Sequence, residues 1–241
     1  MRTVVVVPTY NEVENVREFA RRFGEAAPDL ELLLVDDASP DGTADLAERV
    51  FASRVGYRVY RRTGPRGLGR SYVEAFQCVV GEGYERIVQM DADLSHDPKH
   101  LPALVAATDN ADLAIGSRYC RGGGVREWPA RRILLSRWAN LYVRAIARVP
   151  LSDATAGFRC WTREALMAID LPNVASEGYS FQVEMAWRAH RAGLRIAEVP
   201  IVFTDRHFGE SKLSGHVIWE SARTPWRLRR EVGPSRWREG A

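Results

Sequence analysis

The sequence contains few cysteines, almost no lysine and no long apolar run. Its three cysteines, Cys78, Cys120 and Cys160, are scattered without a Cys-x-x-Cys pair, which argues against a disulfide framework or a zinc site and indicates a reducing compartment. No apolar run approaches the roughly 18–20 residues that a membrane-spanning helix needs. The chain begins at once with a β-branched run, so we expect no signal peptide. Any membrane contact is therefore expected to be peripheral or supplied by a partner.

The modest charge argues against a nucleic-acid partner. The formal net charge is +3 in 241 residues, which is small for a protein that binds a phosphate backbone through bulk charge. Of the 34 basic residues only Lys99 and Lys212 are lysines, an imbalance that a coding bias toward arginine explains. The hydrophobic content of 46% is ordinary for a globular chain and is enough for a sizeable core.

Common nucleotide-binding loops are also missing. No strand is followed by Gly-Lys-Ser/Thr, which excludes a P-loop. The glycines of residues 64–69 have the wrong spacing for a dinucleotide fingerprint, so we expect a mobile loop there. The five histidines show no metal-ligand spacing and are expected to be surface or loop residues.

Strand-like and helix-like segments alternate over the first hundred residues. Residues 4–7 form a continuous β-branched run, as expected of a parallel strand buried on both faces. Residues 13–26 carry apolar side chains at helical spacing. Further strands are expected at 32–35, 58–61, 87–90 and 113–116, and further helices at 43–52 and 67–80. Repeated β–α units predict an α/β fold with a mostly parallel central sheet flanked by helices.

The pattern changes after Tyr119, where a glycine-rich segment leads into longer helices. We expect helices at 130–148, 162–169 and 179–192, and strands at 157–161, 196–199 and 201–203. The sequence shows no internal repeat. It is therefore predicted to form one domain over residues 1–215, followed by a basic amphipathic helix and tail over residues 216–241.

The most informative motif is Asp91-Ala92-Asp93, directly behind the apolar run 87–90. Two carboxylates at a strand end project from the carboxyl edge of the sheet, where open α/β sheets bind ligands. Oxygen donors of this kind suit Mg²⁺ or Mn²⁺, which also take oxygens from a substrate diphosphate. A lone Asp-x-Asp would equally fit a surface turn with two solvated acids.

Two other strand ends favour the ligand site over the surface turn. The run 32–35 leads into Asp36-Asp37, and the run 4–7 leads into a polar segment that ends in Glu12. Three polar strand ends on one edge of a parallel sheet predict a nucleotide-diphosphate site.

A late loop, residues 206–212, carries two cations. Arg206 offers a bidentate fork for a phosphate and Lys212 a point charge, with Gly209 allowing close backbone approach. The alternative is a solvated loop with an ion pair to Glu210, and the sequence leaves both interpretations open.

The last helix, residues 216–230, places Trp219 and Trp226 among four arginines. Such a helix suits the surface of an anionic membrane. An ordinary docked helix with a basic outer face is an equal alternative. Residues 133–146 are apolar enough to be either a core helix or a lipid-facing one.

Together these motifs resemble the dolichol-phosphate mannose synthases and their bacterial polyprenol-phosphate counterparts, within the family 2 glycosyltransferases of GT-A fold. The matching strings span almost the whole chain; they are VVVPTYNEVENV, VDDASPDGTAD, DADLSHDP, IGSRY, SRWANLYVR, DATAGFRCW, EGYSFQVEM and DRHFGESKLSG. PTYNE and DAD are widespread in family 2, whereas GFRCW, GYSFQVEM and RHFGESK are specific to the polyprenol-phosphate branch. Residues 1–215 would then be the GT-A glycosyltransferase domain.

The resemblance implies transfer of mannose from GDP-mannose to a polyprenyl phosphate, with inversion and with Mg²⁺ or Mn²⁺ as cofactor. It assigns the nucleoside to Pro8, Tyr10, Glu12, Val35 and Asp37. The diphosphate falls to Asp91, Ala92 and Asp93, and the metal to Asp91, Asp93 and Ser95, which stands where some relatives have Gln. The cations around the donor diphosphate and the acceptor phosphate would be Arg118, Arg131 or its neighbour Arg132, Arg206 and Lys212.

An anionic acceptor agrees with what the sequence lacks. Family 2 enzymes that glycosylate hydroxyls usually carry a Glu-Asp pair that supplies a base and a Gln-x-x-Arg-Trp motif, and neither occurs here. The resemblance further implies a cytoplasmic protein that is peripheral at the membrane and has a separate membrane-anchoring partner. Two alternatives remain: a UDP-sugar donor such as UDP-glucose, or a non-catalytic nucleotide-sugar-binding subunit.

Overall fold

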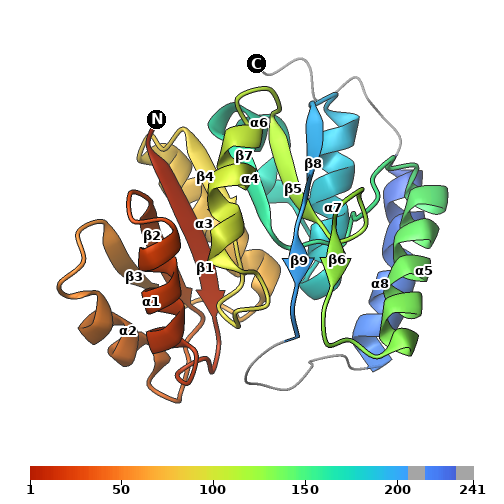
Figure 1. The fold of residues 1–241 in the computed structure, drawn as a ribbon. Helices are drawn as coiled ribbons and strands as arrows, with labels where there is room; N and C mark the ends of the chain where they lie inside the picture. The colour runs from red at the N-terminus through yellow and green to blue at the C-terminus, as the bar shows by residue number, and fades with distance from the viewer. Residues whose placement is uncertain (206–214, 232–241) are drawn as a thin grey trace.

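The computed structural model describes residues 1–205 and 215–231 and builds them around a seven-stranded sheet (Figure 1). The strand order is β3-β2-β1-β4-β7-β5-β8, and all neighbouring pairs are parallel except the two that β7 forms. A second, two-stranded sheet pairs β6 with β9. The strands are β1 (Thr3–Thr9), β2 (Glu31–Asp36), β3 (Tyr57–Arg61), β4 (Arg86–Gln89), β5 (Leu113–Ser117), β6 (Gly124–Val125), β7 (Arg159–Thr162), β8 (Ile196–Pro200) and β9 (Val202–Phe203).

Helices cover both faces of the sheet (Figure 1). Those of the described residues are α1 (Val16–Ala26), α2 (Thr43–Phe51), α3 (Leu68–Gly81), α4 (Leu101–Ala107), α5 (Ala130–Ala147), α6 (Arg163–Ala168), α7 (Gly178–Arg191) and α8 (Gly215–Arg230), with 3₁₀ turns η1 (Pro98–His100) and η2 (Leu171–Asn173). Most expected elements are present within a few residues of their predicted bounds. Helix α1 begins at Val16 rather than at residue 13, because the N–H groups of Asn15 and Val16 first form a turn on the Glu12 carbonyl.

The β1 strand shows why the sheet is buried on both sides. Its four consecutive valines are fully buried, and because strand side chains alternate, they feed two different cores. Val4 packs in the cluster that holds Tyr72 of α3 and Phe181 of α7. Val5 packs in the opposite cluster, which includes Phe19 of α1. A β-branched run with no polar interruption is therefore what this central position requires.

The topology gathers several chain segments at one edge of the sheet. The carboxyl ends of β1, β2, β4 and β5 meet there, since these strands run in the same direction. β7 runs the opposite way, so Arg159 at its start pairs with Gln89 at the end of β4 and with Ile115 of β5. The loop before β7 consequently reaches the same edge. The direction of β7 was not expected from the sequence.

Helix α8 packs against α5 and α7 (Figure 1). Leu228 is fully buried in the same cluster as β1, and the Arg227 guanidinium donates to Glu184 of α7 at 2.8 Å. Trp219 and Trp226 remain exposed on its outer side. The inner face of the helix thus belongs to the core, whereas residues 232–241 of the predicted tail lie outside the described part of the chain. Among the described residues, no helix combines the length and apolarity needed to cross a membrane.

Candidate active site

The Asp91–Asp93 motif lies just past the end of β4, at the edge where the parallel strands end. Asp91 is half-exposed, and Asp93 is buried. The Asp93 Oδ1 atom accepts hydrogen bonds from the Ser95 amide at 3.1 Å and from the Ser95 hydroxyl at 2.6 Å. Leu94, between them, has a φ of 62°, so the chain turns sharply enough to bring the serine back.

This geometry bears on the metal prediction. Asp91 and Asp93 present carboxylate oxygens at the site edge, a donor set that fits Mg²⁺ or Mn²⁺ completed by substrate oxygens. The fully buried Ser95 hydroxyl is directed at Asp93, an arrangement typical of a group that orients a ligand. No group of three or more His, Cys, Asp or Glu side chains suited to a metal occurs in residues 1–205 or 215–231. The assignment of Ser95 as a ligand stays a prediction.

His96 supports the backbone of the same motif. Its Nδ1 accepts the Asp91 amide hydrogen at 3.2 Å, and its ring stacks on Phe158 with centroids 5.1 Å apart. The side chain is almost completely buried. His96 was expected to be a surface or loop histidine. It does lie in a loop, but the expectation that it is exposed is wrong. Burial against two aromatic rings, Phe158 and Phe203, explains the difference.

The nucleoside residues predicted from β1 and β2 lie on the same edge. Pro8 and Val35 are partners in the β1–β2 register. The Val35 side chain is fully buried in the core, so only main-chain atoms of this residue can reach a ligand. The Glu12 carboxylate accepts from the Asn15 side chain at 2.6 Å, and the Glu12 amide donates to Thr43.

Residues 64–69, expected to form a mobile loop, connect to these nucleoside residues. The Gly67 amide donates to Asp37 Oδ2 at 2.8 Å, and the Gly69 amide donates to Glu177 at 2.9 Å. Arg66 donates to the Tyr10 hydroxyl, with its guanidinium carbon 4.6 Å from the ring centroid. Hydrogen bonds therefore hold the loop at Arg66 and at the two glycines that follow it.

A buried ion pair joins Asp37 to Arg62 at the same place. Arg62 also donates to the Pro65 carbonyl at 3.3 Å. Sequence reasoning did not single out Arg62, although it directly follows the expected strand 58–61, or Arg66, because their contacts with Asp37 and Tyr10 join distant parts of the chain.

Arg118 follows β5 and is held by a second buried ion pair. Its Nε and Nη2 donate to the two carboxylate oxygens of Asp153, each at 2.7 Å, and Nη2 also donates to Thr155 at 2.8 Å. Burial alone would lower the Arg118 pKa, but the hydrogen bonds with Asp153 raise it above its ordinary value. Arg118 therefore stays cationic. Its predicted contact with the diphosphate remains a prediction.

The loop before β7 organises this pair. Arg159 donates to the carbonyls of Ala154 and Ala156 at 2.9 and 2.8 Å, and to that of Gln182 in α7. Burial lowers the Arg159 pKa to about 9, with Asp153 opposing part of that shift. The loop that Arg159 fixes carries Asp153. The sequence alone did not show this loop to be functional, because the residues that it contacts lie far away in the chain.

Gly157, in the same loop, lies beside the acidic motif. A Cβ at this position would stand 3.7 Å from Asp91 Oδ2 and 3.4 Å from the Gln182 side chain. The loop that holds Arg118 thus also borders the predicted metal ligands. The motif DATAGFRCW contained this signal, but its letters did not reveal which residue contacts which.

The adjacent arginines at the start of α5 have different positions. Arg132 forms an ion pair with Asp205 at 2.9 Å and lies over the Trp128 ring, 4.0 Å from its centroid. Arg131 is exposed. Asp205 directly precedes the segment that carries Arg206 and Lys212, and these two predicted phosphate-binding residues lie outside the described residues.

Known proteins are similar to the chain over most of its length. The chain matches the family described as Glycosyl transferase family 2 over residues 4–169. It is 48% identical over 222 residues to the polyprenol monophosphomannose synthase of Mycolicibacterium smegmatis, covering 91% of this chain and 84% of that protein. It is 44% identical over 221 residues to the undecaprenyl-phosphate mannosyltransferase of Micrococcus luteus, covering 92% of this chain and 91% of the relative.

Solved structures share the fold. The glucosyl-3-phosphoglycerate synthase of Mycobacterium tuberculosis, in complex with Mn²⁺, UDP and glucosyl-3-phosphoglycerate, superposes with a TM-score of 0.70 at 18% identity, covering 97% of this chain and 81% of that one. The same enzyme with Mn²⁺ and UDP-glucose gives a TM-score of 0.67 at 20% identity, covering 92% and 76%. At such identities the likeness concerns the fold alone. It confirms the predicted GT-A type α/β architecture.

Proposed function

The chain belongs to glycosyl transferase family 2, and on this premise we propose that it transfers mannose from GDP-mannose to the phosphate of a polyprenol. The observation that carries the proposal is the sheet edge itself. Asp91 and Asp93 lie there between the Tyr10–Arg66 and Asp37–Arg62 pairs on one side and the Arg118–Asp153 pair on the other. The two mannosyltransferase relatives, at 48% and 44% identity, support the sugar and the acceptor class.

The acidic motif would hold the donor diphosphate through Mg²⁺ or Mn²⁺. A divalent ion at this position supplies positive charge to the GDP leaving group as the glycosidic bond breaks. Asp91 and Asp93 would be its protein ligands, and the Ser95 hydroxyl would keep Asp93 in the required orientation. Tyr10, Glu12 and Asp37 would bind the nucleoside, with Pro8, Val35 and Ala92 contributing main-chain contacts.

The acceptor needs no general base. A phosphate monoester is largely ionised at neutral pH, since its second pKa is about 6. One of its oxygens would attack the anomeric carbon from the side opposite GDP, so that the bond to the acceptor forms, the bond to GDP breaks and the configuration inverts. The chain must only deliver the phosphate in line. Arg118, Arg131 or Arg132, Arg206 and Lys212 are the cations proposed to do so.

The acceptor also sets the proposed location of the protein. A polyprenyl chain resides in a bilayer, so the enzyme would act as a peripheral protein at the cytoplasmic face, with a separate membrane-anchoring subunit as a possible partner. The small net charge of the chain gives no indication of a nucleic-acid partner.

The test is a transfer assay on the purified chain. We would incubate it with radiolabelled GDP-mannose, Mg²⁺ and a short polyprenyl phosphate, and then extract the lipid. The expected result is label in the organic phase, lost when the metal is chelated. A parallel panel with UDP-glucose tests the alternative donor, and faster transfer from UDP-glucose would overturn the GDP-mannose assignment. Absence of transfer from every donor, with nucleotide binding retained, would point instead to a non-catalytic nucleotide-sugar-binding subunit.

A further inference from the structure

Large apolar side chains are unusually exposed on α5. Leu134, Leu135, Trp138 and Leu141 are between 59% and 70% exposed. The opposite side of the same helix is buried through Val143 and Ala147, so α5 carries apolar side chains both toward the domain and outward. Of the two possibilities for residues 133–146, core or lipid-facing, the structure confirms the core for one side of the helix, while the other side is exposed and its lipid contact stays a prediction.

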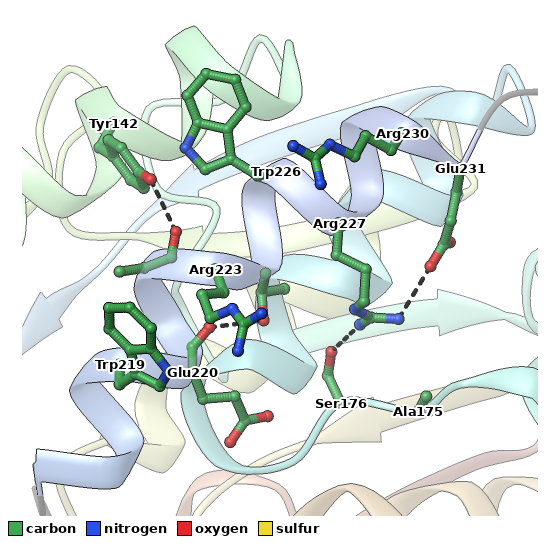
Figure 2. A pocket seen from close by; sticks show the side chains of 12 residues that line it. Tyr142, Ala175, Ser176, Trp219, Glu220, Arg223, Trp226, Arg227, Arg230 and Glu231 are labelled. Carbon is green, nitrogen blue, oxygen red and sulfur yellow. Dashed lines mark hydrogen bonds and ion pairs between the residues drawn. The ribbon is translucent and has the colours of Figure 1, made fainter.

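The neighbouring helix α8 extends this apolar area. Trp219 and Trp226 are seven residues apart, which places them on one side of the helix, and both are exposed. Tyr142 of α5 donates to the Ala222 carbonyl of α8 at 2.8 Å, which ties the two helices together. Figure 2 shows Tyr142 and Trp226 near each other at an open groove of about 1040 Å³.

The exposed apolar side chains of the two helices form one group, which we call the α5–α8 surface; they are Leu134, Leu135, Trp138, Leu141, Trp219 and Trp226. Of the twelve large apolar side chains that are strongly exposed in the described residues, six lie on these two helices. Isolated exposed apolar residues are normal on protein surfaces, but a gathering of this kind marks an interaction site. The next question is what covers it.

Charge identifies the partner. Helix α5 contains four arginines and no acidic residue, and α8 contains four arginines against one acid, Glu220. Arg137 and Arg144 of α5 line a second groove, of about 280 Å³, directly beside Leu141. Leucine and tryptophan flanked by arginine match the interface of an anionic bilayer, where cations meet phosphate headgroups and apolar side chains enter the acyl boundary. A second copy of the chain would instead bring like charges together.

We propose that the α5–α8 surface docks on an anionic lipid bilayer, with headgroup phosphates between Arg137 and Arg144. This inference rests on the proposed function, because a lipid acceptor gives the docking its purpose. The start of α5 is joined to the site edge by the Arg132–Asp205 ion pair. Docking through α5 therefore holds the acceptor half of the site close to the surface from which a polyprenyl phosphate enters.

The apolar part is tested with vesicle flotation of the full chain. The variant Leu134→Ser/Leu141→Ser removes two exposed side chains and should weaken binding to vesicles of phosphatidylcholine and phosphatidylglycerol more than about tenfold. The matched control, Val55→Ser/Met167→Ser, changes two apolar residues elsewhere that are as exposed or more exposed, and it should bind like the wild type. Circular dichroism melting curves verify that both variants fold.

The charged part has its own variant, Arg137→Gln/Arg144→Gln. It should lower affinity for the anionic vesicles about thirtyfold, since each of the two arginines contributes a comparable share of the electrostatic attraction to the headgroups. Binding to pure phosphatidylcholine should change little.

Several outcomes would overturn the docking. One is wild-type binding by both double variants. Another is a concentration-dependent dimer that Leu134→Ser/Leu141→Ser dissociates, because a second copy would then cover the surface. Transfer to a short, water-soluble acceptor should be unchanged in both variants, whereas transfer to a long-chain acceptor in vesicles should fall. If the wild type binds vesicles but transfers no mannose to either acceptor, the docking stands and the proposed function fails.

Discussion

At the ends of β4 and β2, two acids accept hydrogen bonds from serines a few residues away, whereas the arginines that follow β5 are paired with acids far along the chain. Asp93 is oriented by Ser95, and Asp36 accepts the amide of Ser39. Arg118, by contrast, depends on Asp153, 35 residues away, and Arg132 on Asp205, 73 residues away. Asp93 and Asp36 thus take part of their orientation from local turns, although Asp36 also accepts from Thr9, 27 residues away, whereas the two arginines depend on tertiary folding.

The difference separates two kinds of failure under mutation. A locally held group can lose its chemistry while the fold survives, because few distant contacts depend on it. A group held by a distant partner couples chemistry to stability. Asp37 follows the second pattern, since its partners Arg62 and Gly67 are 25 and 30 residues away.

The largest effect is expected for Asp93→Ala. Loss of one metal ligand should reduce transfer on the order of a thousandfold, because a bound divalent ion contributes several kcal/mol of charge stabilisation in the transition state. The melting temperature should change little, since the hydrogen bonds that Ser95 donates to Asp93 span only two residues. Steady-state kinetics beside thermal melting measure both. Near-normal transfer with the metal chelated would show that the site lies elsewhere.

Asp153→Asn should have the opposite signature. It leaves the buried Arg118 cation without its carboxylate, and breaking a buried pair in this way costs about 3–5 kcal/mol of unfolding free energy. Urea denaturation measures the loss. Adding Arg118→Met should restore part of the stability, because the unpaired charge is then removed.

The matched control for that variant is Asp205→Asn. Its pair with Arg132 is partly exposed, so the cost should stay below about 1 kcal/mol. Equal losses for Asp153→Asn and Asp205→Asn would contradict the distinction between the two pairs.

Ser95→Ala tests the local half of the comparison more finely. The hydroxyl donates to Asp93 at 2.6 Å, and removing a group that orients a metal ligand typically costs about 10- to 100-fold in metal affinity or activity. We expect the apparent Mg²⁺ affinity to fall by that factor and saturating Mg²⁺ to restore most of the rate. If saturating metal restores nothing, the serine does not act through the affinity of the metal site.

The smallest effect concerns Glu184, which has a local partner in Arg188 and a distant one in Arg227. Burial would raise the Glu184 pKa, but hydrogen bonds from Ser176 and Arg227 and the nearby Arg188 lower it below 4.5 overall. Because the pKa is lowered in the folded state, the stabilisation is present above pH 4.5 and is lost as the pH falls toward the folded value.

Arg227→Met should remove the distant share of that stabilisation, about 1 kcal/mol at neutral pH. The acid-induced loss of stability below pH 4.5 should accordingly become smaller than in the wild type. Urea unfolding over a pH series measures this. Arg229→Met, an exposed neighbour on α8, serves as control and should leave the pH profile unchanged.

The same distinction explains what was predictable from the sequence. The acidic strand ends and the apolar runs that form the parallel strands depend on neighbours within a few residues, and the structure contains them. The family and the fold class were likewise confirmed, because the motifs are continuous strings. The carboxylate positions at the sheet edge follow directly from strand direction.

The features that could not be predicted from the sequence depend on contacts between distant segments. Nothing in the letters around residue 159 shows that β7 runs antiparallel, so the loop that holds Arg118 was not recognised. The burial of His96 requires Phe203, more than a hundred residues later. The docked inner face of α8 similarly requires Glu184 on α7. Such contacts are set by the tertiary packing of the whole domain.

The antiparallel β7 strand has a consequence for how such enzymes diversify. Residues 118–158 connect the end of β5 to the start of β7. Arg159, the first residue of β7, pairs with Ile115 near the end of β5, so the two ends of this segment lie side by side. That excursion contains α5 and Asp153, while the acidic motif and the first three strands lie outside it. An insertion with adjoining ends can be exchanged as a cassette. Chimeras that swap this excursion between relatives should therefore inherit the acceptor preference of one parent and the donor preference of the other.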